Sequence, residues 1–426
     1  MISVLHFLLA LVLIGRWRWL CIDGSRSWLP VLILTVRVAA GWWCTGYYLQ
    51  HYGGGDMHVF FKDSLLLSDL FFKSPSDYIS VLLGCSSASG HADETLRGMQ
   101  LWYDQGVNLH YNDARTVIRF HALVGLFSGG QIIVHLLWSN VVALAGSLAL
   151  LRFFFTPDDR GKPLPLYSLL ILFLPASLIW SSMLLKEPLL LFALGVTLRY
   201  FQLWMGSGSC RDLLILLIGL TFFLFIKSFW LLVFLPGMMG WMAFRRSTHP
   251  FRVVLLSYVL AGVFLALSGA VYPRFDIPAL LFGQQLEGWR YSVFLGSGSL
   301  FHPLSFAPDW FSLIKHGPEA LHSAVGRPWP DEFIRISNLP FIIENFLVLS
   351  VGLAALWQVS KGKTKPGYGH WLALIAAVII LAICGYISSN SGSLVRYRLP
   401  GLLLLAGALW SMAMRGAPPK PGDSPH

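Results

Sequence analysis

The sequence predicts an all-α polytopic membrane protein with about eleven transmembrane helices, and three observations support this fold class. Hydrophobic residues make up 55% of the 426 residues, whereas charged residues make up only 12%. A soluble protein carries about 25% charged residues, so this chain is too apolar for a soluble fold. Apolar runs of about 20 residues, the length that crosses a bilayer as a helix, recur along the chain. Basic residues concentrate in alternate connections between these runs.

Eleven apolar runs are the predicted membrane segments, and together they form one transmembrane domain over residues 1–415. The first run is the shortest and is either a short span or an interfacial helix. Residues 416–426 are predicted to be a disordered cytoplasmic tail. The segments are Ile2–Ile14, Trp28–Leu49, Gln131–Phe155, Leu164–Leu185, Leu189–Trp204, Leu213–Ile226, Phe229–Phe244, Val253–Tyr272, Phe341–Val359, Trp371–Ser388 and Leu399–Met414.

The charge distribution orients these segments, because loops on the cytoplasmic side of a membrane carry an excess of Lys and Arg. With the N-terminus outside, the inner connections hold 16 of the 31 Lys and Arg residues but only five of the 21 Asp and Glu residues. The net charge of +10 therefore reflects membrane topology, and no nucleic-acid partner is expected.

Two long connections are predicted on the outer side, over residues 50–130 and 273–340. Long loops in compact proteins are usually functional. In the first loop, residues 64–73 and 113–127 combine apolar and charged side chains in a pattern that suits helices lying in the membrane interface. Such helices would cover a lipid headgroup as a lid, or they only pack against the helix bundle.

One carboxylate, Asp56, stands at the start of the first outer loop. The aromatic end of the second segment, Tyr47–Tyr52, is followed by Gly53-Gly54-Gly55 and then by Asp56. Glycines tolerate positive φ and allow a ligand to approach the backbone closely. This order would hold one acid at the rim of the bilayer, facing a lipid-borne substrate, with His58 as a further substrate contact. Alternatively, Asp56 is an ordinary turn residue, since Gly and Asp both favour turns.

Ionisable residues inside or at the end of a membrane span are functional candidates because they are costly there. Arg37 lies in the middle of the second segment. There it would bind a phosphate group; alternatively, its side chain extends to the membrane interface or pairs with another residue in a purely structural role. Lys186 and Glu187 precede Pro188 between the fourth and fifth segments. They would bind phosphate and a sugar hydroxyl or Arg, respectively. Alternatively they only cap a helical hairpin, since Pro and Glu suit the first turn of a helix.

Arg396 and Arg398 lie on the predicted outer side, against the positive-inside trend. In an extended stretch, residues i and i+2 point the same way, so the two side chains would jointly clamp an anionic group. Guanidinium groups bind phosphate oxygens bidentately. Alternatively, both arginines snorkel to the interface. Lys227, between the sixth and seventh segments, is a weaker candidate at the same rim.

The second outer loop supplies the last candidates. Trp329 offers a stacking surface for a sugar ring, and Asp331 and Glu332 offer carboxylates that bind hydroxyl groups. Glu344 follows at the start of the ninth segment. The alternative is a proline-rich turn that leads into a span.

Other site classes have no motif in the sequence. There is no P-loop, no dinucleotide-binding glycine fingerprint and no zinc-type histidine pair. The five cysteines are scattered without a CxxC pair, so they predict neither a disulfide framework nor a zinc site. Because the candidate phosphate ligands are cationic side chains, no metal and no cofactor are expected.

Three elements resemble a known group of membrane enzymes. The aromatic, glycine and Asp56 stretch is similar to the start of the first large outer loop in the GT-C superfamily of integral-membrane glycosyltransferases. Trp180-Ser181-Ser182 with Lys186-Glu187, and Arg396-Tyr397-Arg398, look like elements of bacterial membrane proteins found with polysaccharide genes. The chain departs from the superfamily in having a single acid after the glycines. Its first large loop also follows the second predicted segment instead of the first.

The resemblance implies that Asp56 is a general base and that the donor is a sugar on a polyprenyl phosphate. The acceptor would be a glycan or a lipid, and the reaction would occur at the outer face of a bacterial inner membrane. Arg396, Arg398, Lys186 and Arg37 would stabilise the leaving phosphate, and Glu187, His58, Trp329, Glu332 and Glu344 would contact the substrates. Two alternatives stay open: a polysaccharide polymerase or ligase that uses a polyprenyl-diphosphate oligosaccharide, and a transporter of lipid-linked sugar.

Overall fold

The computed structural model describes residues 1–16, 28–85, 90–103, 112–156, 164–294, 296–332 and 338–414. The predicted tail, 416–426, lies outside these residues. The chain divides into two compact units. Unit 1 comprises Met1–Leu172 and Ser177–Ser228, and unit 2 comprises Phe173–Ala176 and Phe229–His426.

Helices make up nearly all of the described part of both units. In unit 1 they are α1 (Ile2–Arg16), α2 (Trp28–Tyr52), α3 (Asp56–Lys73), α4 (Pro75–Leu83), α5 (Gly90–Arg97), α6 (Ala114–Ser128), α7 (Ile132–Phe155), the 3₁₀ helix η1 (Leu166–Phe173) and α9 (Glu187–Ser207). In unit 2 they are α11 (Pro250–Val271), η2 (Pro273–Phe275), α12 (Ile277–Phe294), α13 (Trp310–Gly326), η3 (Pro330–Glu332), α14 (Leu339–Ser360), α15 (Tyr368–Ile387), α16 (Ser391–Tyr397) and α17 (Leu399–Met414). The last residue of η1, Phe173, belongs to unit 2, and two further helices, α8 (Pro175–Trp180) and α10 (Cys210–Ala243), have residues in both units.

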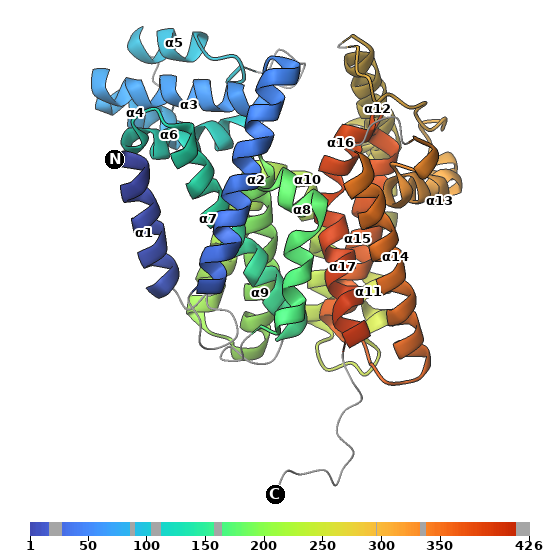
Figure 1. Cartoon of the computed structure of the whole chain (residues 1–426). Helices are drawn as coiled ribbons and strands as arrows, with labels where there is room; N and C mark the ends of the chain where they lie inside the picture. The colour runs from blue at the N-terminus through green and yellow to red at the C-terminus, as the bar shows by residue number, and fades with distance from the viewer. Residues whose placement is uncertain are drawn as a thin grey trace, which may run out of the picture. The chain divides into compact units, whose positions relative to one another are not determined.

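Small residues allow the central helices of unit 1 to pack closely. A Cβ atom at Gly195 of α9 would overlap the carbonyl group of Gly146 of α7, so the two backbones are in contact there. Close backbone approach at small residues is the usual way in which helices associate inside a membrane. Within unit 1, α3 lies across one end of the upright helices α1, α2 and α7, and α6 packs beneath it (Figure 1).

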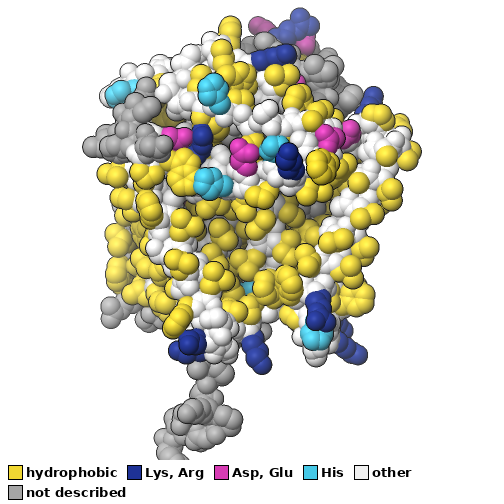
Figure 2. Space-filling view, turned by 90° about the vertical axis from the view of Figure 1, so that its right-hand side faces the viewer, with side chains coloured by type: hydrophobic (Ala, Val, Ile, Leu, Met, Phe, Trp, Pro, Cys, Tyr) yellow, Lys and Arg dark blue, Asp and Glu magenta, His cyan; other side chains and the backbone are white. Residues whose placement is uncertain are grey.

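Unit 2 is built around α14, α15 and α17, which lie side by side, with α12, α13 and α16 near one end (Figure 1). Gly385 of α15 packs against the backbone of Ala320 of α13. The face of unit 2 seen in Figure 2 carries hydrophobic side chains over its middle. Lys and Arg side chains gather at its lower end, whereas acidic, basic and histidine side chains mix at its upper end. A hydrophobic middle between two polar ends is the surface expected of helices that face lipid.

Seven described helices are long and apolar enough to cross a membrane, which supports an all-α polytopic membrane protein. They are α2, α7, α9, α10, α11, α14 and α15. The pair α16 and α17, which is bent by 54°, would make an eighth span if counted together.

The predicted count of eleven is therefore too high for the described helices, and the reasons are local. Residues 2–16 form a short apolar helix. The fourth predicted segment is divided at Pro175 into a 3₁₀ helix and a six-residue helix, because proline cannot continue the hydrogen-bond ladder of a preceding helix. The sixth and seventh segments are two stretches of α10, which is broken at Lys227.

Candidate functional site

The glycine turn before Asp56 adopts the conformation that its sequence predicts. Gly53 and Gly54 have φ angles of 67° and 122°, which residues with a Cβ rarely adopt. The turn ends α2 and starts α3, so that Asp56 is exposed in the first turn of α3. A carboxylate is favoured there by the positive end of the helix dipole. His58 lies against Gly54, and burial followed by the charge of Lys62 lowers the pKa of its imidazole.

An aromatic stack leads along α2 to this turn. The rings of Trp43 and Tyr47 stack with centroids 5.6 Å apart, and those of Tyr47 and His51 stack at 4.1 Å. Residues four apart share one face of a helix, so the three rings form a continuous row. Trp43 is 66% exposed, so this row lies on the surface of unit 1.

A cluster of one carboxylate and two ammonium groups, here termed the Asp113 cluster, lies in the same unit. The Lys186 Nζ atom donates to Asp113 Oδ1 at 2.5 Å, and the Lys227 Nζ atom is 3.2 Å from Asp113 Oδ2. The three side chains are between 18% and 24% exposed. They are therefore reachable by a ligand, yet screened by water less than surface ion pairs are.

Three helix ends bring these residues together. Asp113 directly precedes α6, and Lys186 directly precedes α9, whose second residue is Pro188. Lys227 occupies the break in α10, where its backbone is non-helical with φ −154° and ψ 74°. The hydroxyl group of Thr116, in the first turn of α6, donates to the carbonyl of Phe225 at 2.9 Å and so fixes α6 against the part of α10 before the break.

The Asp113 cluster also lies beside the first turns of α3. The Lys186 Nζ atom lies 6.0 Å from the ring centroid of Phe60, within the range of a cation–π contact. Phe60 is buried and stands four residues after Asp56. Residues four apart are one helical turn apart on the same side of a helix, so Asp56 precedes Phe60 by one turn of α3. An exposed carboxylate therefore starts the helix whose second turn Lys186 contacts.

The two lysines also set the charge of Asp113. Burial alone would raise the pKa of the Asp113 carboxyl, but Lys227 and Lys186 outweigh it and lower this pKa below its usual value. A depressed pKa in the folded state stabilises the fold at pH values above the unfolded pKa of about 3.9, and this stabilisation is lost as the pH falls through the folded pKa.

Asp113→Asn is therefore expected to reduce the stability of the fold at pH 6 by roughly 2 kcal/mol, because it removes charge-assisted hydrogen bonds. At an acidic pH below the folded pKa of Asp113 the difference from wild type should shrink, since the wild-type carboxyl is then protonated as well. Thermal unfolding in detergent at the two pH values measures this. A difference that is absent at pH 6, or that grows as the pH falls, would contradict the ion pair.

Arg37 and Asn140 hold the non-helical segment that leads to Lys186. Both side chains are fully buried. The Arg37 Nη2 atom donates to the carbonyl oxygen and the hydroxyl oxygen of Ser181 at 2.8 and 2.9 Å, and the Asn140 Nδ2 atom donates to the carbonyl oxygen of Ser182 at 2.9 Å. Residues 181–186 have no helical hydrogen-bond ladder of their own, and backbone of this kind is tolerated at membrane depth only where protein groups satisfy it. This placement favours a structural pairing of Arg37.

Glu187 is also buried, at 6% exposure, as the first residue of α9.

A second group of predicted residues meets in unit 2. Arg398 and Glu344 are fully buried, with the Arg398 Nη2 atom 3.4 Å from Glu344 Oε1 and 2.8 Å from Asn345 Oδ1. The Arg398 Nη1 atom donates to the carbonyl oxygens of Ala324 and Arg327 at 2.9 and 2.6 Å. Glu344 Oε2 accepts from the backbone N–H of Ala176 at 2.7 Å. These bonds tie the end of α13 to α14 and α17, which favours a structural role for Arg398 and Glu344.

The predicted joint clamp of Arg396 and Arg398 rests on an extended backbone, and that expectation is wrong. Residues 391–397 form the helix α16, which Asn390 caps by accepting from the N–H of Ser393 at 2.8 Å. Arg398 follows as the C-cap residue with a helical backbone conformation, and residues two apart in such a backbone point in different directions. Accordingly Arg398 is buried, whereas Arg396 is partly exposed.

The segment that follows α13 carries Trp329 and Glu332. Glu332 Oε1 lies 3.2 Å from Arg327 Nη1, and its Oε2 accepts from the backbone N–H of Trp329 at 3.1 Å. The indole of Trp329 packs against Gly326 and lies 4.6 Å from the His322 ring, so the ring already has protein neighbours. The side chain of Asp331 lies outside the described residues.

The candidates from the sequence thus fall into two groups, one in each unit: Asp56, His58, Lys186, Glu187 and Arg37 in unit 1, and Trp329, Glu332, Glu344, Arg396 and Arg398 in unit 2. Sequence reasoning missed Asp113, Asn140 and Asn345. Asp113 begins a predicted helix, and Asp is a common residue at a helix N-terminus, so the sequence suggests only an N-cap role for it. Its bond to Lys186 joins residues 73 positions apart, which no local pattern encodes.

Comparison with known proteins finds no matching family model, no matching curated protein and no matching solved structure. Among the described residues, no group of three or more His, Cys, Asp or Glu side chains is placed to hold a metal ion.

Proposed function

We propose that the chain is an integral-membrane glycosyltransferase of the GT-C type, which transfers one sugar from a polyprenyl phosphate to a glycan or lipid acceptor. The observation that carries this proposal is the Asp113 cluster beside the first turns of α3. The cluster supplies two ammonium groups that can stabilise a leaving phosphate, Lys186 and Lys227, and α3 supplies a carboxylate that can accept a proton, Asp56.

The chemistry needs both kinds of group. The acceptor hydroxyl loses its proton as it attacks the anomeric carbon, and a positioned carboxylate takes that proton. Asp56 suits this role because it is exposed and is placed by a rigid helix start after a glycine turn. The bond between the anomeric carbon and the phosphate oxygen breaks at the same time, and the lipid phosphate leaves with additional negative charge.

Lys186 and Lys227 suit the stabilisation of that charge. An ammonium group has three N–H donors, so a lysine bound to Asp113 still has the capacity to bind a phosphate oxygen. The three groups of the cluster carry a net positive charge, and they are partly shielded from water, which strengthens their attraction for an anion. Asp113 would keep the two ammonium groups in place between turnovers.

The membrane setting supports a lipid-borne donor. The exposed aromatic row of α2 leads to the Asp56 turn, and aromatic side chains favour the boundary between lipid and water. The helices α3 and α6, which correspond to the two predicted interfacial helices, would shield the reaction from water. With the orientation given by the positive-inside rule, the reaction would take place at the outer face of a bacterial inner membrane.

The phosphate site can be tested with polyprenyl phosphate itself, the part of the donor that does not depend on the sugar. We expect wild-type protein in detergent to bind polyprenyl phosphate, measured by native mass spectrometry. Lys186→Gln combined with Lys227→Gln should weaken binding by roughly 30-fold, because each charge-assisted contact contributes at least about 1 kcal/mol.

Lys62→Gln combined with Lys73→Gln is the matched control, since it removes two exposed charges from α3 outside the cluster. This control should bind like wild type. Equal weakening by both double variants would assign the effect to diffuse charge and contradict the phosphate site. Lys186→Arg combined with Lys227→Arg should retain most of the affinity.

A further inference from the structure

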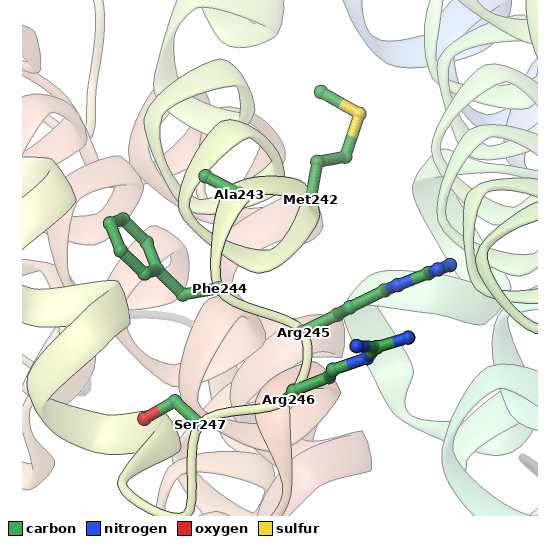
Figure 3. Close-up of a pocket in the computed structure, with 6 residues that line it drawn as sticks. All are labelled: Met242, Ala243, Phe244, Arg245, Arg246 and Ser247. Carbon is green, nitrogen blue, oxygen red and sulfur yellow. The ribbon is translucent and has the colours of Figure 1, made fainter.

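The end of unit 2 where α10 meets α11 combines basic side chains with an open cavity. The cavity has a volume of about 400 Å³ and is lined by Met242, Ala243, Phe244, Arg245, Arg246 and Ser247. Figure 3 shows Arg245 and Arg246 extending side by side in the same direction from the turn, with Phe244 on its other side. Within the described residues, neither arginine has an acidic partner.

The charge around this cavity is of one sign. Residues 229–272 and 345–414 of unit 2 contain no Asp or Glu at all, whereas His249, Arg252 and Lys361 follow the two arginines along the chain. Two adjacent guanidinium groups without a carboxylate repel each other, and this repulsion is relieved when an anion binds between them. The cavity therefore favours an anionic ligand.

The surroundings of the cavity are those of a membrane interface. Trp241 and Tyr368 stack with ring centroids 5.7 Å apart and planes 12° apart, and the Tyr368 hydroxyl donates to the carbonyl of Phe244. Phe251 packs on Trp371 at 4.6 Å, and the Lys361 ammonium lies 4.7 Å from the Trp357 ring. Aromatic residues at this density are typical of the level of lipid headgroups.

An apolar surface borders the same cavity. Met242 and Phe244 line it and are 41% and 60% exposed. The neighbouring side chains of α10 and α11 are also exposed and apolar, among them Met239, Leu255 and Val259. A ligand with an anionic headgroup and hydrocarbon chains can therefore contact both the arginines and the apolar side chains. A small free anion can contact only the arginines.

We propose that this cavity binds the headgroup of an anionic phospholipid, with the phosphate between Arg245 and Arg246 and the acyl chains along α10 and α11. Guanidinium groups bind phosphate oxygens bidentately, which supplies geometry as well as charge. Basic pockets between helices at the cytoplasmic side of a membrane are known to hold such headgroups. The site is independent of the proposed transferase chemistry.

Native mass spectrometry of the delipidated full chain in detergent tests this site, with phosphatidylglycerol and phosphatidylcholine as lipid probes. Wild-type protein should bind phosphatidylglycerol more tightly than phosphatidylcholine, and an excess of inorganic phosphate should not displace it. Arg245→Gln combined with Arg246→Gln should lose affinity for phosphatidylglycerol by roughly 30-fold, which corresponds to about 2 kcal/mol. Arg245→Lys combined with Arg246→Lys should give an intermediate loss, because charge is kept while the bidentate fork is lost.

Lys363→Gln combined with Lys365→Gln is the matched control. It removes the same charge from exposed positions of unit 2 that do not line the cavity. We expect it to change the affinity less than about threefold. Equal losses in the two glutamine variants would overturn the proposal, since the arginines would then contribute only to the general positive charge. Equal binding of phosphatidylcholine, or displacement by inorganic phosphate, would overturn it as well.

Discussion

Asp56→Asn is expected to lower the rate of sugar transfer by about 100- to 10,000-fold, which is the usual contribution of a general base. The substitution keeps the size of the side chain and removes its ability to take a proton. Substrate affinity should change little, because the phosphate contacts assigned to Lys186 and Lys227 are kept. The measurement is the initial rate of transfer from the lipid-linked sugar in membranes that contain equal amounts of each protein.

Asp69→Asn is the control for this substitution. Asp69 is exposed on the same helix, α3, more than three turns away from Asp56. The Asp69→Asn variant loses the same charge from an exposed position of the same helix, so its rate of sugar transfer should match that of wild type. A near-normal rate for Asp56→Asn, or a loss of equal size for Asp69→Asn, would remove Asp56 from the proton-transfer step.

Arg398→Gln is expected to destabilise the fold by about 3–5 kcal/mol, the cost of removing one partner from a buried ion pair. The substitution leaves the Glu344 carboxylate without its cation, and it leaves the carbonyl groups of Ala324 and Arg327 without their shared donor. Thermal or denaturant unfolding of the purified protein in detergent measures the change.

Arg396→Gln provides the comparison, because Arg396 lies in α16, the short helix that ends just before Arg398, and is partly exposed. It should change the stability by less than about 1 kcal/mol. If Arg398 instead served mainly to bind substrate phosphate, its replacement would leave the stability unchanged and reduce donor affinity. That result would contradict the structural role argued from its hydrogen bonds.

The class of fold could be predicted from the sequence because membrane helices are specified by local composition. The bounds of α7, α11 and α14 lie within a few residues of the predicted segments, since a long apolar run has only one stable form in a bilayer. The prediction failed where length and apolarity were not sufficient. Residues 164–185 are apolar enough for a span, but Pro175 and the polar residues 181–182 divide them, and Arg37 and Asn140 hold the division in place.

The candidate site could be predicted only in part. Gly53-Gly54-Gly55-Asp56 specifies its own turn, so the position of Asp56 at a helix start follows from local chemistry. The pairing of Lys186 and Lys227 with Asp113 joins residues that are far apart in the sequence. The sequence alone therefore does not show that these residues are partners. The same holds for Arg398, whose carbonyl partners lie more than 70 positions away. A buried arginine and a ligand-binding arginine look alike until their neighbours are known.

Mass spectrometry of the lipid that co-purifies in mild detergent tests whether a polyprenyl-phosphate sugar is the donor and whether Asp56 is the base. Wild-type protein should retain bare polyprenyl phosphate, because its turnover removes the sugar. Asp56→Asn should retain polyprenyl phosphate that still carries one sugar, since it binds the donor without transferring from it. A polyprenyl diphosphate with an oligosaccharide would contradict single-sugar transfer and favour a polymerase, ligase or transporter. Bulk phospholipid alone in both proteins would contradict a polyprenyl-phosphate donor.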